Sequence, residues 1–559
     1  MKLLEQLHNI KGTSNNSKFV TPAKAGVQLF RGLLDSCFRR NDIFRGCLKI
    51  ECLLLLLCLV VGFGLRFYGF DQKSLWIDEV HTYNDSREGL PGQIKYFKEH
   101  PADLLHPPLF YVLTHAFHPF EKPERDLRII PLIFGVLSIP LIYFLARLFS
   151  PSIALPCTLA LTFMTYHISF SQDGRSYSMV LFLGMVGLYF FIQHLRTWKM
   201  SYLFLAAVSF ALLFYTSYSG ILFIVFCQIL WFYDIADNKK PNLSSLLILN
   251  GIIFLLCVFW VIFIVVNYKG QPIFDDLFKV DVGSLWGILA GTFNDWAPLA
   301  PLTVISIVLL VLFPICSENR KNAFLLLALI FSPIVGLYLF YKIFNINHYF
   351  TSRYVINFLP CFFISIFLSL NAIEARLNRW KRIFRLRLLF LILFIASNLF
   401  ILSLYYRSEK QDFRGLVSYL QGQLEDGDKI FVKSTTYIPG MLHYFRVYPK
   451  SRHYDFPVWV DDSGNEVLAE VRLVGPNKRF TIHYSSLGYH RYTMNGGRLW
   501  IIVGKTDLKE MKECSDCIFK GYFDGTFCNF RRFPSDASMY LFLHDPKSHQ
   551  EKRIDLPPE

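Results

Sequence analysis

Two adjacent acids, Asp78 and Glu79, lie in the stretch Ser74-Leu-Trp-Ile-Asp-Glu-Val-His81, directly after the first long apolar run of the chain. An apolar run of that length can cross a bilayer, so these acids are expected at a membrane surface. A carboxylate in that position can act as a general base on a lipid-linked substrate. Acids beside apolar runs also simply hydrate the interface, so the rest of the chain must decide between the two interpretations.

The composition is that of an integral membrane protein. The 559 residues are 53% hydrophobic, the mean hydropathy is +0.35, and apolar runs repeat through the first part of the chain. The formal net charge is +14, but Lys and Arg cluster in short links between apolar runs. That pattern indicates membrane orientation and not nucleic-acid binding. The 12 cysteines are scattered, several within apolar runs, and predict no disulfide framework.

Eleven segments are apolar and long enough to span a bilayer, which takes about 17 to 25 residues. They are 48–68, 128–148, 152–171, 177–195, 201–217, 219–234, 245–267, 298–316, 323–344, 354–373 and 387–406. The segment 106–118 is shorter and begins with His-Pro-Pro, so we predict a short helix lying at the interface. Residues 1–46 are polar and basic, look like a translated intergenic repeat, and are predicted to be a disordered extension.

The basic residues predict which face of the membrane each link occupies. With the N-terminus inside and eleven spans, nearly every basic link, including the dense cluster 376–387, falls on the cytoplasmic side. Counting 106–118 as a further span would move the later links to the wrong sides. The opposite face then collects the links 66–127, 171–177 and 348–354, so almost all polar residues that could do chemistry share one side.

The last 150 or so residues have ordinary polarity and predict a small soluble domain. Short β-like runs at 429–433, 479–483 and 499–503 follow an amphipathic helix near 412–424, which favours an α/β fold. The sequence Cys514-Ser-Asp-Cys517, together with Cys528, could give one disulfide in an oxidising compartment and leave an odd thiol. A zinc site would lack its fourth ligand.

Several motifs resemble, in their order and spacing, the signatures of the GT-C membrane glycosyltransferases. They are Leu75-Trp-Ile-Asp-Glu, His106-Pro-Pro-Leu-Phe-Tyr, Arg125 with Arg128-Ile-Ile-Pro, Ser171-Gln-Asp-Gly-Arg-Ser-Tyr and Ser352-Arg-Tyr. The relatives are the protein O-mannosyltransferase, aminoarabinose transferase and Rgt-type lipid A galacturonosyltransferase group, often called glycosyltransferase family 39 or dolichyl-phosphate-mannose mannosyltransferase-like. The resemblance covers roughly 50–430.

The resemblance implies a polytopic α-helical membrane protein with a GT-C fold. Its parts would be the extension 1–46, a transmembrane glycosyltransferase domain of about eleven helices at 47–406, and a periplasmic α/β domain at 407–559. The implied activity is that of a hexosyl- or mannosyltransferase-like enzyme of the bacterial inner membrane. It would move one sugar, with inversion, from a polyprenyl-phosphate carrier to a hydroxyl of lipid A, another envelope lipid or a protein.

The same resemblance suggests the acids that act in catalysis. Asp78 matches the first acid of the family's Asp-Glu pair and is the expected base, and Glu79 would position the acceptor or hold a cation. An adjacent acid raises the pKa of its neighbour, which favours a base that works near neutral pH. Asp173 stands where many relatives carry Glu and would be a second carboxylate, one carbon shorter.

The leaving group of such a transfer is a lipid phosphate, and its growing charge must be met by cations or oriented donors. His106, Arg175, Arg353 and Tyr354 are the expected donor-phosphate residues. Arg353 stands just before a span, where it can hold a headgroup while the carrier stays in the bilayer. Its alternative role is snorkelling to anionic lipid.

Three questions stay open at the level of sequence. Relatives differ over a divalent cation, and Asp78, Glu79, Asp173 and His348 could make a mixed oxygen and nitrogen site. The link 268–297, which contains Asp295-Trp296, is either a lid over the acceptor or an interfacial loop with an aromatic belt. A transporter or flippase, or an O-antigen ligase or polymerase, is the alternative function. The absence from the sequence of an internal repeat and of mid-span charges argues against a transporter.

Overall fold

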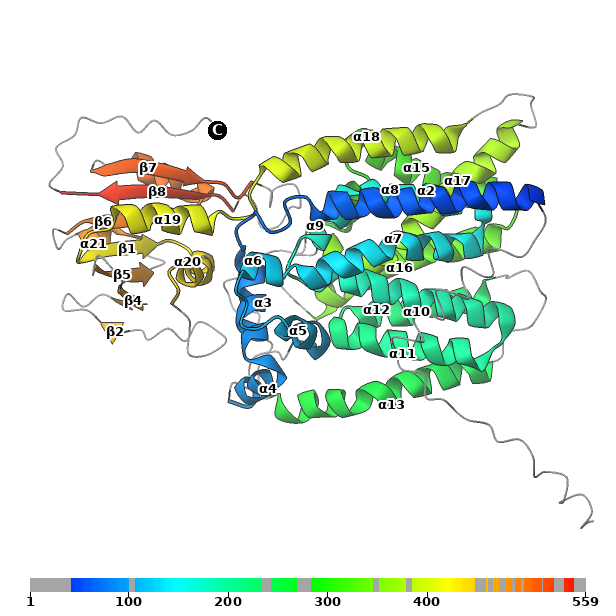
Figure 1. The fold of residues 1–559 in the computed structure, drawn as a ribbon, viewed down its shortest axis with the longest axis horizontal. Helices are drawn as coiled ribbons and strands as arrows, with labels where there is room; N and C mark the ends of the chain where they lie inside the picture. The colour runs from blue at the N-terminus through cyan, green and yellow to red at the C-terminus, as the bar shows by residue number, and fades with distance from the viewer. Residues whose placement is uncertain are drawn as a thin grey trace, which may run out of the picture. The chain divides into compact units, whose positions relative to one another are not determined.

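The computed structural model describes most of the membrane domain and the framework of the C-terminal domain (Figure 1). The described residues are 42–99, 106–233, 243–268, 283–344, 351–378, 385–447, 459–460, 466–467, 469–472, 478–484, 488–493, 497–514, 516–526 and 537–546. Of the predicted extension 1–46, residues 1–41 lie outside this set. The chain forms two compact units, Met1–Leu57 and Cys58–Glu559, and the packing reported below lies within the second.

The membrane domain is made of long apolar helices. These are α2 (Asp42–Phe67), α7 (Ile129–Phe149), α8 (Pro151–Phe163), α9 (Thr165–Ser171), α10 (Tyr177–Thr197), α11 (Met200–Thr216), α12 (Gly220–Cys227), η1 (Gln228–Phe232), α13 (Leu243–Asn267), α14 (Leu285–Trp296), α15 (Ala300–Cys316), α16 (Arg320–Ile343), η3 (Ser352–Phe358), α17 (Leu359–Asn378) and α18 (Leu386–Arg407). Every predicted span overlaps one of these helices or a pair of them. The fold class predicted from sequence is therefore confirmed.

The number of spans is less simple than the predicted eleven. Among the described residues, seven helices are long and apolar enough to cross a membrane, or up to nine if each of two bent pairs counts as one span. The pair α8 and α9 bends by 59°, and the pair α14 and α15 bends by 106°. Pro298 lies at the second break, where a proline disfavours helical backbone in the residue before it. The predicted spans 201–217 and 219–234 coincide with shorter apolar helices.

The long link after α2 is also helical. It contains α3 (Ile77–Arg87), α4 (Gly89–Glu99), α5 (Pro108–His115) and α6 (Pro123–Asp126). Helix α5 is the short helix predicted at 106–118, and it has proline in its first turn, where the missing N–H is not needed. Its depth relative to a membrane stays a prediction, as does the orientation of the chain.

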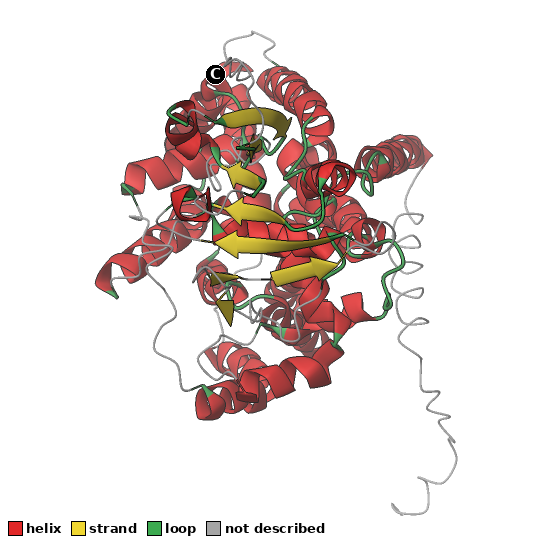
Figure 2. Cartoon of the chain, turned by 90° about the vertical axis from the view of Figure 1, so that its left-hand side faces the viewer, coloured by secondary structure: helices red, strands yellow, loops and turns green. Residues whose placement is uncertain are grey.

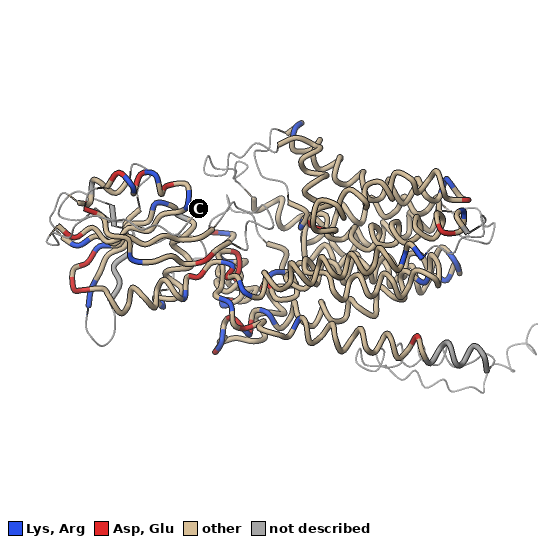
Figure 3. Tube along the Cα trace, turned by 90° about the horizontal axis from the view of Figure 1, so that it is seen from above, with Lys and Arg blue, Asp and Glu red and all other residues tan. Residues whose placement is uncertain are grey.

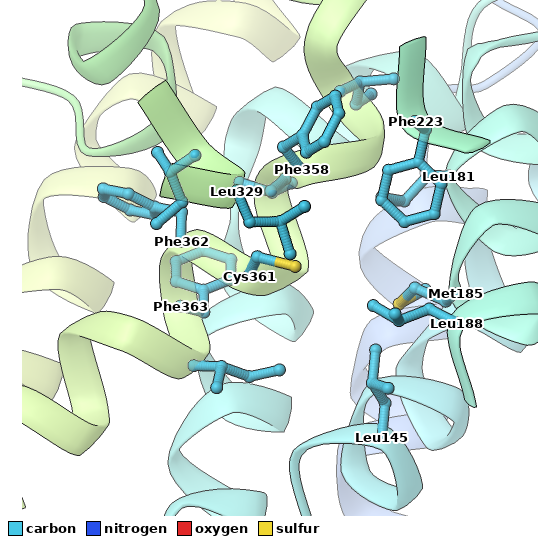
Figure 4. Close-up of a cluster of buried hydrophobic side chains, with 14 of the residues drawn as sticks. Leu145, Leu181, Met185, Leu188, Phe223, Leu329, Phe358, Cys361, Phe362 and Phe363 are labelled. Carbon is cyan, nitrogen blue, oxygen red and sulfur yellow. The ribbon is translucent and has the colours of Figure 1, made fainter. Parts of the chain in front are cut away.

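Buried apolar side chains from many helices form one core. Figure 4 shows part of it, where Phe362 and Phe363 lie on one side, Leu181 and Met185 on the other, and Phe358 and Leu329 between them. Cys361 is also buried there as a free thiol, so it packs as a small apolar residue, as the sequence predicted. By contrast, Phe259 of α13 is 79% exposed, as expected for a helix that faces lipid. Figure 3 shows that charged residues gather near the ends of the helices and are sparse along their middles.

The C-terminal domain is a small α/β domain, as predicted. Its six-stranded sheet has the order β4-β5-β1-β6-β8-β7 (Figure 2). The strands are β1 (Asp428–Val432), β4 (Ala469–Arg472), β5 (Arg479–Tyr484), β6 (Leu499–Val503), β7 (Cys517–Phe523) and β8 (Met539–His544), with β2 (Trp459–Val460) and β3 (Glu466–Val467) paired separately. Strand β1 runs parallel to β5 and β6 in the centre.

Helices complete the C-terminal domain. They are η4 (Thr435–Tyr437), α19 (Phe413–Gln423), α20 (Ile438–Tyr444), α21 (His490–Thr493), η5 (Lys505–Asp507) and α22 (Leu508–Lys512). The apolar face of α19 is buried against the sheet in one cluster with Ile430 and Trp500. Cys514 and Cys517 form a disulfide, and Cys528 lies outside the described residues. The domain is joined to α18 by a short connection, residues 408–412.

Candidate active site

Asp78 lies in the first turn of α3 and meets two arginines from distant parts of the chain. Its Oδ2 atom is 3.0 Å from Nη1 of Arg353 and 4.0 Å from Nε of Arg175. The side chain of Asp78 is 19% exposed, and those of Arg353 and Arg175 are 11% and 20% exposed. The acid and both cations can therefore be reached from solvent. Sequence reasoning expected these three residues on one face, and the structure brings them together.

The two arginines are held in place by further contacts. Arg175 donates from Nη1 to the carbonyl of Asp78 at 3.3 Å and to Oγ1 of Thr82 at 3.2 Å. The guanidinium carbon of Arg353 lies 5.7 Å from the ring centre of Tyr177 and 5.4 Å from that of Tyr354. Aromatic rings attract a guanidinium group and restrict its position. Tyr354 thus supports Arg353, and Tyr177 was not among the residues expected from sequence.

Asp78 is ionised at neutral pH. Burial by itself raises the pKa of its carboxyl, but the guanidinium groups of Arg175 and Arg353 outweigh burial, so the pKa lies below its usual range. The expectation that Glu79 would raise the pKa of Asp78 is wrong. The two arginines lie next to Asp78, whereas the charge of Glu79 is offset by cations of its own.

Glu79 is completely buried and has a set of partners different from that of Asp78. Its carboxylate accepts two hydrogen bonds of 2.7 Å from Nε and Nη2 of Arg128 and one of 2.7 Å from the backbone N–H of Gly174. Nζ of Lys410 lies 3.3 Å from Oε1, and the N–H of Trp76 lies 3.4 Å from Oε2. With a side chain that is 0% exposed, Glu79 cannot position an acceptor. It does hold cations, but they are the protein's own side chains.

Asp173 belongs to the same buried cluster. Its Oδ1 accepts from Nζ of Lys410 at 3.1 Å and from Nε1 of Trp76 at 2.9 Å. Lys410 also donates to the carbonyl of Gln172 at 3.1 Å. Asp173 is 2% exposed, so it is placed as a structural partner of the loop that carries Asp78 and not as a second carboxylate open to substrate.

Two residues of this cluster were not recognised as site residues from the sequence. Arg128 belongs to the motif Arg128-Ile-Ile-Pro at the start of α7. It is fully buried and pairs with Glu79, which accounts for an arginine at this position. Lys410 gave no signal, because a single lysine after the last apolar run is usually solvated. Its partner Glu79 lies 331 positions earlier, so only the fold reveals the pair.

The other expected residues lie near the site in different settings. Nε2 of His106 lies 3.8 Å from Oδ2 of Asp85, and its ring stacks on Tyr111 with centres 5.5 Å apart. Residues 268 and 283–297 of the link 268–297 are described. There Oδ2 of Asp295 accepts from Oγ of Ser352 at 2.5 Å. Trp296 is fully buried in the core, whereas Trp286 near the start of the same helix is 80% exposed, so the two ends of α14 lie in different environments.

The acids of the site do not fit a divalent cation. Asp78 is paired with arginines, and Glu79 and Asp173 share Lys410. Within the described ranges there is no group of three or more His, Cys, Asp or Glu side chains that could hold a metal ion. His348, the fourth proposed ligand, lies outside those ranges.

The buried cluster predicts a pH dependence of stability. Burial raises the pKa of Glu79, but Arg128 and Lys410 oppose it more strongly and bring the pKa to about 2, below its ordinary 4.5. A lowered pKa means that ionised Glu79 stabilises the fold above about pH 4.5 and that this stabilisation is lost as the pH falls toward 2. We therefore expect the unfolding temperature of the purified protein to fall across this window more steeply than that of Glu79→Gln. Equal slopes would contradict the assigned pairing.

Comparison with known proteins agrees with this architecture. Residues 105–264 match the family described as dolichyl-phosphate-mannose-protein mannosyltransferase. The crystal structure of ArnT from Cupriavidus metallidurans in the apo state matches with a TM-score of 0.52 at 11% identity, over 89% of this chain and 98% of that one. The Archaeoglobus fulgidus oligosaccharyltransferase in the apo form matches with a TM-score of 0.43 at 12% identity, over 73% of this chain and 61% of that one. No curated protein matches the chain in sequence.

The ArnT likeness shows the fold. The chain therefore has an ArnT-like fold, that of a multi-pass membrane protein with apolar helices and a small C-terminal sheet domain. The match to the mannosyltransferase family covers residues 105–264, less than a third of the chain, so the likeness that extends over the whole chain is one of fold.

Proposed function

We propose that the protein is an inverting glycosyltransferase that moves one sugar from a polyprenyl-phosphate carrier to a hydroxyl acceptor. The observation that carries the proposal is the partly exposed carboxylate of Asp78, which lies 3.0 Å from Arg353 and 4.0 Å from Arg175. The description of the matching family, which names dolichyl-phosphate-mannose, supports a lipid-phosphate donor. A hexosyl or mannosyl donor is the corresponding sugar class.

The residues account for both halves of the reaction. The acceptor oxygen forms a bond to the anomeric carbon from the face opposite the phosphate, while the carbon–oxygen bond to the phosphate breaks. Asp78 accepts the proton of the acceptor hydroxyl as that bond forms. Arg353 and Arg175 stabilise the negative charge that grows on the departing lipid phosphate.

The arrangement couples donor binding to the basicity of Asp78. In the free protein, the two arginines lower the pKa of Asp78. A phosphate bound to the same guanidinium groups competes for their positive charge and adds a negative one, and both effects raise the pKa of the acid. Asp78 thus becomes a stronger base when the donor is present.

The proposal places this chemistry at the periplasmic face of a bacterial inner membrane. The cluster of basic residues at 376–387 supports this orientation through the positive-inside rule. The acceptor is a hydroxyl of lipid A, another envelope lipid or a protein.

A deletion strain tests the proposal directly. Mass spectrometry of envelope lipids and glycoproteins from a strain that lacks the gene should show the loss of one sugar mass from a defined molecule, restored by the wild-type gene. The lost mass would name the sugar and the molecule would name the acceptor. If the deletion strain instead accumulated the lipid-linked sugar on the cytoplasmic face of the membrane, and the transfer step itself were intact, the protein would be a flippase.

Arg353→Ala tests the phosphate role. Hydrogen bonds to charged groups contribute about 1.5–3 kcal/mol, so we expect the Kd for undecaprenyl phosphate to rise ~10- to 100-fold. Arg353→Lys keeps the charge but not the planar fork and should give an intermediate value. Native mass spectrometry or microscale thermophoresis of the purified protein measures both.

Arg376→Ala is a matched control for that experiment. Arg376 lies in the last turn of α17, the helix that follows Arg353, and donates to the carbonyl of Ile315. Its removal should leave the Kd unchanged. If Arg353→Ala bound undecaprenyl phosphate as tightly as this control, Arg353 would not hold the donor phosphate.

A further inference from the structure

The loop that leads into α3 has an unusual pattern of hydrogen bonds. The backbone N–H groups of four consecutive residues, 74–77, all donate to side-chain oxygen atoms. The N–H of Ser74 bonds to Oε2 of Glu409 at 3.2 Å, and that of Leu75 to the hydroxyl of Tyr444 at 2.8 Å. The N–H of Trp76 lies 3.4 Å from Glu79, and that of Ile77 bonds to Oε1 of Gln411 at 3.0 Å.

Three of these four acceptors come from beyond the last membrane helix. Glu409 and Gln411 belong to the connection that follows α18, and Tyr444 ends α20 of the C-terminal domain. Along the connection the side chains alternate in direction. Glu409 and Gln411 bond to the loop, while Lys410 between them bonds to Glu79 and Asp173. One short segment therefore contacts both the backbone of the catalytic loop and the acids beneath it.

The connection is itself fixed to the sheet of the C-terminal domain. The backbone N–H of Glu409 donates to Oδ2 of Asp524 at 2.7 Å, and the N–H of Asp412 donates to the carbonyl of Asp524 at 2.9 Å. Asp524 directly follows β7. The hydroxyl of Tyr444 also donates to Oε1 of Glu124 at 2.9 Å, so this tyrosine joins the C-terminal domain to two parts of the link after α2.

These contacts decide the conformation of the loop. A buried N–H group without an acceptor is strongly disfavoured, and Leu75 is fully buried. Residues 74–76 form neither a helix nor a strand, so no regular pattern of backbone hydrogen bonds supplies acceptors for their N–H groups. If the side chains of Glu409, Gln411 and Tyr444 are absent, the loop must adopt another conformation, and Asp78 moves with it.

We propose that the connection 408–411 and Tyr444 are positioning elements of the active site, so that the C-terminal domain is part of the catalytic unit. This inference rests on the proposed function, because it assigns to Asp78 the role of base. Reacting groups must be held within a fraction of an ångström of their productive geometry. The C-terminal domain supplies this constraint at the entrance to α3.

Tyr444→Phe tests the inference with two measurements on the full-length protein. Hydrogen–deuterium exchange should become at least ~10-fold faster in peptides covering 72–83, because the N–H of Leu75 loses its acceptor. In a transfer assay kcat should fall ~10-fold or more while KM for the lipid donor stays within about twofold, because Arg353 and Arg175 are untouched. Tyr419→Phe is the control, since Tyr419 packs in the same domain against Trp500 and Phe523.

A pair of substitutions at Glu409 separates positioning from general destabilisation. Glu409→Leu removes the acceptor for Ser74 and should reproduce both effects of Tyr444→Phe. Glu409→Gln keeps an acceptor oxygen at the same length and should restore slow exchange and kcat. The inference is overturned if exchange in 72–83 is unchanged in Tyr444→Phe and Glu409→Leu, or if Glu409→Gln behaves like Glu409→Leu.

Failure of the proposed function gives a different result. In that case the wild-type protein transfers no sugar, while the exchange measurement still reports whether the C-terminal domain holds the loop. If the wild type is inactive but exchange is fast in Tyr444→Phe, the C-terminal domain holds the loop before α3 but has no role in sugar transfer. If the wild type is active but exchange is unchanged in Tyr444→Phe, the proposed function stands and the C-terminal domain does not position the loop.

Discussion

Asp78→Asn is expected to lower kcat by ~10²- to 10⁴-fold, the usual contribution of a general base. Asparagine keeps the size of the side chain but cannot accept the acceptor's proton. The Kd for undecaprenyl phosphate should stay the same or decrease. In the variant, Arg353 and Arg175 lose the carboxylate that competes with the phosphate for their charge.

Asp71→Asn provides the control for this loss. Asp71 is an exposed acid seven positions earlier in the same link, so its removal changes the local charge equally and should leave kcat unaltered. Transfer is measured by the appearance of the glycosylated acceptor in membranes supplied with lipid-linked sugar. Full transfer by Asp78→Asn with normal donor binding would show that another group takes the proton.

Glu79→Gln is expected to destabilise the protein by about 3–5 kcal/mol, the usual effect of removing one partner from a buried ion pair. Glu79 and Asp173 carry two negative charges, and Arg128 and Lys410 carry two positive ones. The substitution leaves one buried cation without a counter-charge. The free energy of unfolding in detergent, measured by denaturant titration, reports this change.

A double-mutant cycle makes the test specific. Adding Lys410→Met to Glu79→Gln restores neutrality, because Arg128 and Asp173 remain, so the double variant should lose less stability than the sum of the single ones. The exposed pair Lys95 and Glu99, 4.0 Å apart on α4, is the matched control. Glu99→Gln should cost about 1 kcal/mol or less. Additive losses at Glu79 and Lys410 would contradict their pairing.

The meeting of Asp78 with the two arginines was predictable because of where each lies relative to a span. Asp78 follows the first span, Arg175 follows the third predicted span, and Arg353 precedes the tenth. Residues at the same ends of packed helices share a membrane face whatever the packing of the helices. Sequence reasoning could therefore gather these residues without knowing any contact between them.

The division of labour between Asp78 and Glu79 was not predictable in the same way. Adjacent acids look equivalent in a sequence, but neighbouring residues on a helix point about 100° apart, so only one of the pair can face an opening. The second must be buried and needs a counter-charge. Arg128 and Lys410 supply it, and the partnership of Lys410 arises from tertiary packing across most of the chain.

The helix count was obscured for a local reason. Two of the eleven predicted spans, 201–217 and 219–234, are apolar helices of fewer than 18 residues, and hydropathy is also blind to a bend within an apolar stretch. The 106° bend between α14 and α15 occurs at Pro298, and the predicted link before it contains a helix that ends in the buried Trp296. The proline was visible, but the packing of Trp296 was not.

The bonding of Lys410 to Glu79 has a consequence for how the protein is made. The first membrane helices are synthesised long before residue 410 leaves the ribosome, so during that interval Glu79 has Arg128 as a partner while Asp173 lacks Lys410. The loop before α3 also lacks Glu409, Gln411 and Tyr444 until the chain is nearly complete. We expect a nascent chain that stops before the C-terminal domain to be inserted but inactive, so that partly made copies do not consume donor lipid.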